Sequence, residues 1–257
     1  MEIIVSDNNG VRTLKLNRPE VFNSFNQKMA FALHQELDKA EADNNVRAIV
    51  LIGEGKAFCA GQDLAEVMDP NGPELTSIVA NHYNPIIERI RKIEKPIIGA
   101  VNGVAAGAGA NIAIACDITI AKKSAAFIQA FSKIGLIPDS AGTFFLPRII
   151  GFQKAAALMM IGDKVSAEDA AAMNMIYKAV DDENFEAEVY KLAEKLAQMP
   201  TKGLGLTKRA LNLSMTNNLT QQLAVEGELQ TLAGQTYDYN EGVNAFLEKR
   251  TPVFKGE

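Results

Sequence analysis

Three short, continuous runs of apolar residues constrain the fold of this chain more than any other feature. They are RAIVLIG (Arg47–Gly53), PIIGAVNG (Pro96–Gly103) and DITIAKK (Asp117–Lys123). Strands with unbroken apolar runs are buried on both faces, which is typical of parallel sheets covered by helices. Parallel strands also need long crossover connections, and helical stretches separate these runs. The sequence therefore predicts an α/β fold.

The N-terminal part predicts a hairpin followed by a helix. EIIVSD and VRTLKLN alternate apolar and polar residues around the tripeptide NNG, a pattern typical of two antiparallel strands joined by a tight turn. Further along, Asn26 is a favourable N-cap, and Met29, Leu33 and Leu37 recur at helical spacing. We expect a helix from Asn26 to Asn44.

From about Ser166 onward the pattern changes to successive amphipathic helices. The segments that show it are SAEDAAAM, NFEAEVYKLAEKLAQM, TKGLGLTKRALNLSM, LTQQLAVEGELQTLAG and NEGVNAFLEKR, punctuated by Pro200, Gly234 and Asn240. Their apolar stripes are wide for a layer that faces solvent, which suggests packing against neighbouring subunits. We therefore divide the chain into a core over residues 1–195 and a C-terminal helical oligomerisation region over residues 196–257.

The composition excludes several classes of function. The 257 residues carry a formal net charge of −5, which gives no electrostatic attraction to nucleic acid or to an anionic membrane. No apolar run approaches the roughly 20 residues that a membrane span needs. The start, MEIIVSDNNG, is acidic where a secretory signal is basic. We expect a cytoplasmic protein without nucleic-acid or membrane partners.

Cysteine and histidine are too sparse to suggest a metal site. Cys59 and Cys116 lie in apolar stretches, where buried free thiols are the ordinary interpretation. His34 and His82 have no His, Cys or carboxylate partner at metal-ligand spacing, which argues against a metal site and against a histidine-based triad. We expect each histidine to lie at the surface or to cap a helix.

Two glycine-rich turns are candidates for chemistry. GKAFCAGQDLAEV follows the first apolar run and GVAAGAGANIAIACD follows the second, so each places small residues where a strand ends and a helix begins. Such turns leave main-chain N–H groups unpaired, and two that converge on one point form an oxyanion hole. Small residues at such places also let a helix pack closely against a strand. The residues alone leave both interpretations open.

Several segments together resemble the signature of one family. FCAGQDL, NGVAAGAGANIAIACDITIA, FSKIGLIPDSAGT, LPRIIG and EGVNAFLEKR are similar, in order and spacing, to the crotonase (enoyl-CoA hydratase/isomerase) superfamily, over essentially the whole chain. Within it, the runs YNP, AVNGVAAGAGA, AFSKIGLIPD and LGL look like those of the bacterial ring-1,2-epoxyphenylacetyl-CoA isomerases of phenylacetate degradation. The resemblance implies a ββα spiral core, acyl-CoA substrates, and a homotrimer or a dimer of trimers.

The resemblance also implies residues that bind the thioester. The two oxyanion donors fall on the main-chain N–H groups of Gln62 and Ala108, which would hold the thioester carbonyl and stabilise an enolate. The residues expected to contact coenzyme A are Ala60, Gly61, Asp63, Leu64, Phe246 and Lys249, the last two from an adjacent subunit. Asp63 is also expected to cap or pin its turn. A core phenylalanine and a solvated lysine are the alternatives at 246 and 249.

Hydratases of this family activate water with two glutamates, and this chain has neither. The matching positions hold Asn111 and Phe131, which do not exchange a proton in this pH range. A carboxylate appears instead at Asp139, in an almost uncharged context where the hydratases carry glycine, and the resemblance makes it the catalytic residue. Burial is expected to raise its pKa and to suit it to act as base and then as acid. Its alternative role is an N-cap for a helix that starts near Ser140.

Five side chains are candidates for the wall of an acyl pocket, although such residues are more often ordinary core. They are Tyr83, Asn111, Phe127, Phe131 and Phe144. One carboxylate suffices for isomerisation, so we expect an acyl-CoA isomerase that shifts a double bond or opens a ring epoxide. The alternatives are an enoyl-CoA hydratase that uses Asp139 or Asn111 in an unusual way, and a non-catalytic acyl-CoA-binding or scaffold protein. No metal or redox cofactor is expected, since coenzyme A is part of the substrate.

Overall fold

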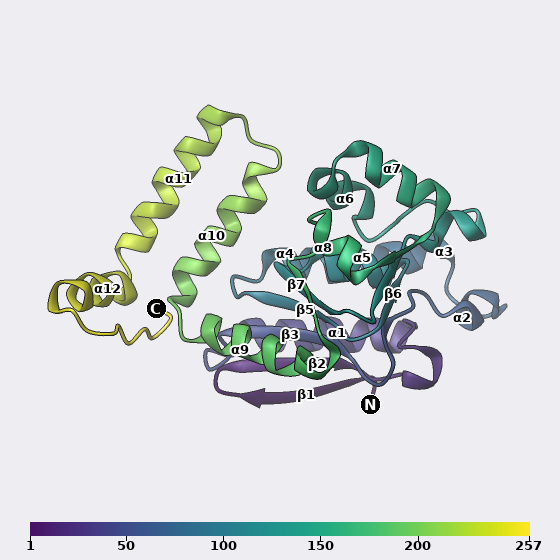
Figure 1. Cartoon of the computed structure of the whole chain (residues 1–257), viewed down its shortest axis with the longest axis horizontal. Coiled ribbons are helices and arrows are strands. Elements are labelled where there is room, and N and C mark those ends of the chain that lie inside the picture. Colours follow the sequence, from purple (N-terminus) through teal and green to yellow (C-terminus); the bar gives the residue numbers. More distant parts are fainter.

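Two β-sheets organise the molecule, which a computed structural model describes over residues 1–257 (Figure 1). The larger sheet has the strand order β1-β2-β3-β5-β7-β10, and the smaller has the order β4-β6-β8-β9. The strands are β1 (Ile3–Asn8), β2 (Val11–Leu16), β3 (Ala48–Gly53), β4 (Ala57–Cys59), β5 (Ile97–Val101), β6 (Val104–Ala106), β7 (Ile118–Lys122), β8 (Ala126–Ile128), β9 (Lys164–Ser166) and β10 (Lys178–Val180). The predicted α/β class is confirmed.

The larger sheet is parallel from β2 to β10, and the N-terminal hairpin adds β1 at one edge. Its centre consists of the three apolar runs, as β3, β5 and β7. Successive side chains of a strand point to opposite faces. On β3, Ile49 and Leu51 enter one hydrophobic core, whereas Val50 and Ile52 enter the other. Because both faces are covered, the runs are continuous instead of alternating.

The helices cover these sheets and then extend beyond them. They are α1 (Gln27–Ala42), α2 (Leu64–Met68), α3 (Leu75–Ser77), α4 (Asn84–Lys92), α5 (Ala108–Ala115), α6 (Gly142–Ile150), α7 (Phe152–Ile161), α8 (Ala167–Ala172), α9 (Phe185–Ala197), α10 (Thr201–Ser214), α11 (Leu219–Gly234) and α12 (Tyr237–Glu248). Shorter turns are the 3-10 segments η1 (Pro19–Val21), η3 (Ala130–Ile134) and η4 (Asp182–Asn184) and the π-helical turn η2 (Ile78–Tyr83). One core lies between the sheets and α1, α4 and α5, and the other lies under α9.

Local signals near the N-terminus are confirmed. Asn9 and Gly10 have φ angles of 49° and 77°, the left-handed pair that a type I′ hairpin turn requires. The Asn26 side chain accepts a hydrogen bond of 2.9 Å from the Met29 N–H and caps α1, which ends at Ala42.

Three sequence-based expectations need correction. The region after Ser166 is not entirely helical, because it contains β10, which pairs with β7 and forms an edge of the parallel sheet. The strands of the smaller sheet were missed, since runs of three residues show no periodicity that can be recognised. The histidines are neither exposed nor capping. His34 and His82 are buried, and the His34 Nε2 atom lies 2.9 Å from the His82 carbonyl oxygen. Cys59 and Cys116 are buried free thiols, as predicted.

The C-terminal helices leave the core. α9 packs on the larger sheet, whereas α10 and α11 project away from it and α12 lies at the opposite end of the molecule from α2 (Figure 1). Large apolar side chains are exposed on these helices, and they include Leu211, Leu219, Leu223, Phe246 and Leu247. None of the helices combines the length and the apolar character needed to cross a lipid bilayer.

Two helical glycines give a matched test of the packing that positions α5. A Cβ at Gly109 would lie 2.4 Å from the Cys59 carbonyl oxygen, whereas a Cβ at Gly227 of α11 would meet no atom within 4 Å. Gly109→Ala is expected to lower the free energy of unfolding by about 1–3 kcal/mol through overpacking. Gly227→Ala is expected to raise it by about 0.5–1 kcal/mol, since alanine favours the helix. Urea unfolding of both variants measures the difference, and equal effects would contradict the packing described.

Candidate functional site

Two glycine-rich turns meet at the carboxyl ends of β4 and β6. Gly61 follows β4 with a φ of 93°, and a Cβ on it would lie 3.0 Å from the Ala106 carbonyl oxygen and 3.5 Å from the Ala108 nitrogen. Only glycine allows both this backbone conformation and this approach. The turn that precedes α2 therefore lies directly against the turn that precedes α5.

Both predicted oxyanion donors have free N–H groups. Ala108 is the first residue of α5, where main-chain N–H groups have no acceptor inside the helix. The Gln62 N–H makes no main-chain hydrogen bond, although its neighbours do: Ala60 and Asp63 donate to the carbonyl groups of Phe22 and Phe25. The N-terminal end of α5 adds a positive partial charge. Two unpaired donors beside a helix start are suited to bind a carbonyl oxygen or an oxyanion.

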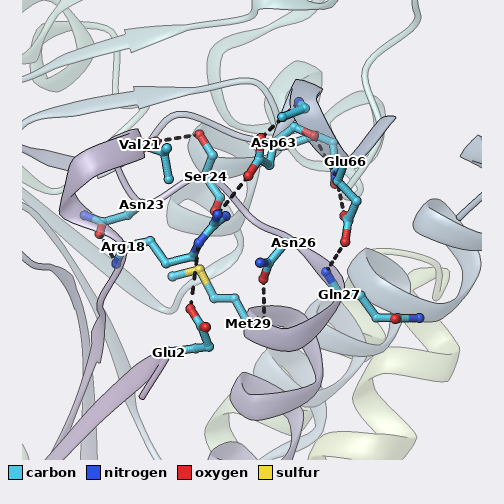
Figure 2. Close-up of polar contacts among 12 residues, drawn as sticks. Glu2, Arg18, Val21, Asn23, Ser24, Asn26, Gln27, Met29, Asp63 and Glu66 are labelled. Carbon is cyan, nitrogen blue, oxygen red and sulfur yellow. Dashed lines mark hydrogen bonds and ion pairs between the residues drawn. The ribbon is translucent and has the colours of Figure 1, made fainter. Parts of the chain in front are cut away.

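An ion pair fixes the turn that carries Gln62, and Figure 2 shows its members. The Arg18 guanidinium donates to the Ser24 carbonyl at 2.6 Å and to the Asp63 carboxylate at 2.8 Å. The other Asp63 oxygen accepts from the Ala65 N–H at 3.0 Å and caps α2. The side chains of Arg18 and Asp63 are each 15% exposed, so the pair is shielded from solvent. Asp63 thus pins the turn, as expected from the sequence.

The Gln62 side chain is held from two sides, which the sequence did not reveal. The Tyr83 hydroxyl donates to Gln62 Oε1 at 2.9 Å, and Gln62 Nε2 donates to Glu66 at 2.8 Å. Glu66 also accepts from the Gln27 N–H at the start of α1 (Figure 2). Burial, followed by the nearby Cys59 and Asp139, raises the pKa of Tyr83 well above its usual value, so the phenol keeps its proton.

Asp139 lies in a strained turn before α6. Ser140 and Ala141 have φ angles of 51° and 57°, each a left-handed conformation that costs of the order of 1–3 kcal/mol in a residue other than glycine. The half-buried carboxylate accepts a 2.8 Å hydrogen bond from Ser140 Oγ and has no cationic partner. Burial is the main cause that raises its pKa. The N-cap alternative is wrong, because α6 starts at Gly142 without any side-chain cap.

Residues on neighbouring elements connect Asp139 to the oxyanion turns. Asn111, one helical turn after Ala108 on α5, donates from Nδ2 to the Asp139 carbonyl at 2.8 Å. Phe131 of η3 is buried, and its ring lies close to Gly107, since a Cβ there would come 3.8 Å from Phe131 Cζ. The two turns, Asp139 and Phe131 therefore occupy one region of the molecule.

Other predicted pocket residues lie deeper or elsewhere. Tyr83 is buried with its hydroxyl directed at Gln62, and Phe127 of β8 is fully in the core. Phe144 lines a cavity of about 450 Å³ between α4, α6 and α10. Arg148 lies over its ring, 4.0 Å from the ring centroid.

The residues expected to contact coenzyme A fall into two groups. Ala60, Gly61, Asp63 and Leu64 form the turn after β4, and Leu64 is 55% exposed. Phe246 and Lys249 lie on or just after α12, far from that turn in the same chain (Figure 1), and Phe246 is 83% exposed. The alternative of a core phenylalanine at 246 does not fit this exposure.

The family model Enoyl-CoA hydratase/isomerase matches residues 6–257. The chain belongs to this family. It is 50% identical to a 1,2-epoxyphenylacetyl-CoA isomerase of Escherichia coli (strain K12), with 100% of each chain covered. It is 44% identical to a probable enoyl-CoA hydratase of Rhodobacter capsulatus, over 96% of this chain and 95% of the relative.

Solved structures agree with this assignment. A putative enoyl-CoA hydratase/isomerase from Mycobacterium abscessus superposes with a TM-score of 0.93 at 36% identity, over 99% of this chain and 100% of that one. An enoyl-CoA hydratase from Bacillus anthracis gives a TM-score of 0.93 at 31% identity, with 100% of both chains covered. The fold is therefore the crotonase fold, and the sequence resemblance is confirmed at the level of the superfamily.

The Arg18–Asp63 pair generates a stability prediction. Asp63→Asn keeps an oxygen that caps α2 but removes the charge that faces Arg18. We expect the free energy of unfolding to fall by about 1.5–3 kcal/mol, the value of hydrogen bonds to charged groups. The matched control is Glu88→Gln, whose pair with Lys92 has side chains 64% and 76% exposed and is expected to change stability by less than about 0.5 kcal/mol. Urea unfolding compares the two, and an equally small effect of Asp63→Asn would contradict the anchoring role.

Proposed function

We propose that this member of the enoyl-CoA hydratase/isomerase family is an acyl-CoA isomerase, with Asp139 as its acid–base residue. The observation that carries the proposal is the isolation of Asp139. It is a half-buried carboxylate with a raised pKa and no cation beside it, and its main chain is hydrogen-bonded to α5, the helix that starts at the proposed donor Ala108. Desolvated carboxylates of this kind are suited to move protons near neutral pH.

The proposed reaction conserves all atoms of the substrate. The thioester oxygen accepts hydrogen bonds from the N–H groups of Gln62 and Ala108, which acidifies the α-carbon. The Asp139 carboxylate removes the α-proton, and the electron pair delocalises into an enolate. The negative charge of the enolate lies on the thioester oxygen, which the two N–H groups bind. The protonated Asp139 then returns the proton to another carbon of the conjugated system. With a ring epoxide, the bond between the two epoxide carbons also breaks, so that the six ring carbons and the oxygen become a seven-membered oxepin of the same composition. The chain needs one carboxylate for this cycle.

The neighbouring acids support isomerisation over hydration. Adding water requires one group to take a proton from water while another supplies a proton to carbon. Asp63 is paired with Arg18, and Glu66 accepts from Gln27 and Gln62, so both carboxylates are already engaged. At the positions of the hydratase glutamates stand an amide, Asn111, and a phenyl ring, Phe131. No second free carboxylate is available beside Asp139.

For the acyl group, we propose the ring epoxide of phenylacetyl-CoA, with 3-enoyl thioesters as the simpler alternative. The support is the 50% identity to a relative named for 1,2-epoxyphenylacetyl-CoA. Exposed apolar side chains on both flanks of the site also suit an aromatic or long acyl chain. They are Leu64, Val67 and Met68 on α2, and Ile134, Leu136 and Ile137 before Asp139.

For the assembly, we propose a homotrimer or a dimer of trimers built through α10–α12. The exposed apolar side chains on these helices support such packing. In that assembly Phe246 and Lys249 would reach the coenzyme A of an adjacent subunit, since α12 lies far from the β4 turn of its own chain (Figure 1).

Asp139→Asn tests the proposed role of the carboxylate. We expect kcat with the ring epoxide or with 3-hexenoyl-CoA to fall about 10²–10⁴-fold, the usual contribution of general acid–base catalysis, with little change in KM. In the parent enzyme, the acidic limb of kcat/KM is expected above the ordinary aspartate value of 3.8, because the folded pKa is raised. Retained activity of Asp139→Asn would refute the proposal.

A second assay distinguishes isomerase activity from hydratase activity. Hydration is the alternative because some relatives, such as the Rhodobacter capsulatus protein, are named as probable enoyl-CoA hydratases. Crotonyl-CoA is supplied, and the loss of its conjugated thioester absorbance is followed. We expect slow or no hydration. Fast hydration that Asp139→Asn abolishes, together with no isomerase activity, would reverse the assignment.

The raised pKa of Asp139 also predicts a pH-dependent effect on stability. Because the folded state holds this proton more tightly than the unfolded state, stability decreases as pH rises from 3.8 through the folded pKa. Asp139→Asn removes the desolvated charge, so its Tm is expected to exceed the parent Tm at neutral pH. The difference is expected to disappear below 3.8, where both states of the parent are protonated. Thermal unfolding across pH measures it, and a Tm difference independent of pH would contradict the prediction.

A further inference from the structure

We propose that Asn111 is a positioning residue, which holds the turn of Asp139 through a hydrogen bond from its side-chain amide to the Asp139 main-chain carbonyl. This inference rests on the proposed function, because it assigns Asn111 a task that serves the Asp139 carboxylate. Asn111 itself is not proposed to touch the reacting atoms.

The turn of Asp139 needs an external restraint. Ser140 and Ala141 both adopt left-handed conformations, which residues with side chains leave when nothing holds them. The Asp139 carbonyl accepts from the Gly142 N–H at 2.9 Å, a bond within the turn, and from Asn111 Nδ2 at 2.8 Å. The Asn111 bond is the one that ties this turn to α5, the helix whose first residue is the proposed oxyanion donor Ala108.

The orientation of the Asn111 amide is determined by its partners. A carbonyl oxygen can only accept, so the atom that faces Asp139 must be Nδ2. Oδ1 then points to Gln129, whose Nε2 donates to it at 2.8 Å. Asn111 is 1% exposed and Gln129 is 2% exposed, so water does not compete for these bonds. Gln129 follows β8, and the amide pair therefore links three elements around Asp139.

Gly142 shows how closely the turn and the amide approach each other. A Cβ at this position would lie 2.3 Å from Asn111 Nδ2 and 2.8 Å from Oδ1. Only a residue without a side chain permits the contact, although Gly142 does not have a positive φ. The glycine is thus needed for the approach and not for its backbone conformation.

The chemistry of Asn111 explains why an acid would not serve here. A carboxylate at 111 could not donate to the Asp139 carbonyl, and its negative charge would raise the pKa of Asp139 further. The amide at 111 meets both requirements, because it donates to the turn of Asp139 and places no negative charge beside the carboxylate.

The test compares Asn111→Asp, Asn111→Ala and Gly142→Ala with the parent enzyme and with Asp139→Asn. We expect Asn111→Ala and Gly142→Ala to lower kcat about 10–100-fold with KM nearly unchanged, since small misplacements of a catalytic group carry such costs. Asn111→Asp is expected to lower kcat and to move the acidic limb of kcat/KM to higher pH. Gly142→Ala keeps the amide but displaces it, so it remains informative if Asn111→Ala does not fold.

Asn102→Asp is the matched control. Asn102 is another buried asparagine, and its Nδ2 donates to the carbonyl groups of Gly55 and Ala57, away from Asp139. We expect it to lower stability but to leave the acidic limb of kcat/KM in place. Parent-like kcat and pH profiles for the Asn111 and Gly142 variants, with Asp139→Asn inactive, would overturn this inference and leave the proposed function standing. An active Asp139→Asn enzyme would overturn the proposed function, and this inference with it.

Discussion

The close approach of two backbone turns is the constraint on which the rest of this structure depends. Gly61 lies against Ala106 and Ala108, and Gly109 lies against Cys59, so that β4 and α5 touch through main-chain atoms. Such contacts exclude even a methyl group, and every residue of α5 is buried. The contacts hold the Ala108 nitrogen close to the turn that carries Gln62.

Around this contact, the charged groups have different tasks. Asp63 is neutralised by Arg18 and fixes a turn, and Glu66 is occupied by amide donors (Figure 2). Asp139 is half-buried without a cation and accepts one side-chain hydrogen bond, from Ser140. Asp63 and Glu66 each accept hydrogen bonds from two groups and support the structure, whereas the acid proposed for chemistry is less engaged.

Sequence patterns predicted the features that repeat along the chain. β3, β5 and β7 were evident because short, largely apolar runs signal burial on both faces, and Asn26 was evident because a cap acts on its own helix. Strands of three residues, β10 among them, were missed, since runs this short show no periodicity that can be recognised. The bonds of Tyr83 to Gln62 and of Asn111 to Asp139 were hidden because they join residues 21 and 28 positions apart. Phe144 was assigned to the acyl pocket by residue type alone, yet it lines the cavity between α4, α6 and α10, and Arg148 lies over its ring.

The use of main-chain donors has a consequence for mutational scanning. At Ala108 the group of interest is an N–H, which every amino acid except proline retains. In a saturation library, the size of the side chain would therefore decide which substitutions at this position retain activity. Proline would be the exception, because it alone removes the N–H group. The proposed oxyanion donors would leave little trace in side-chain substitutions, and the nearby glycines would appear as the intolerant positions instead.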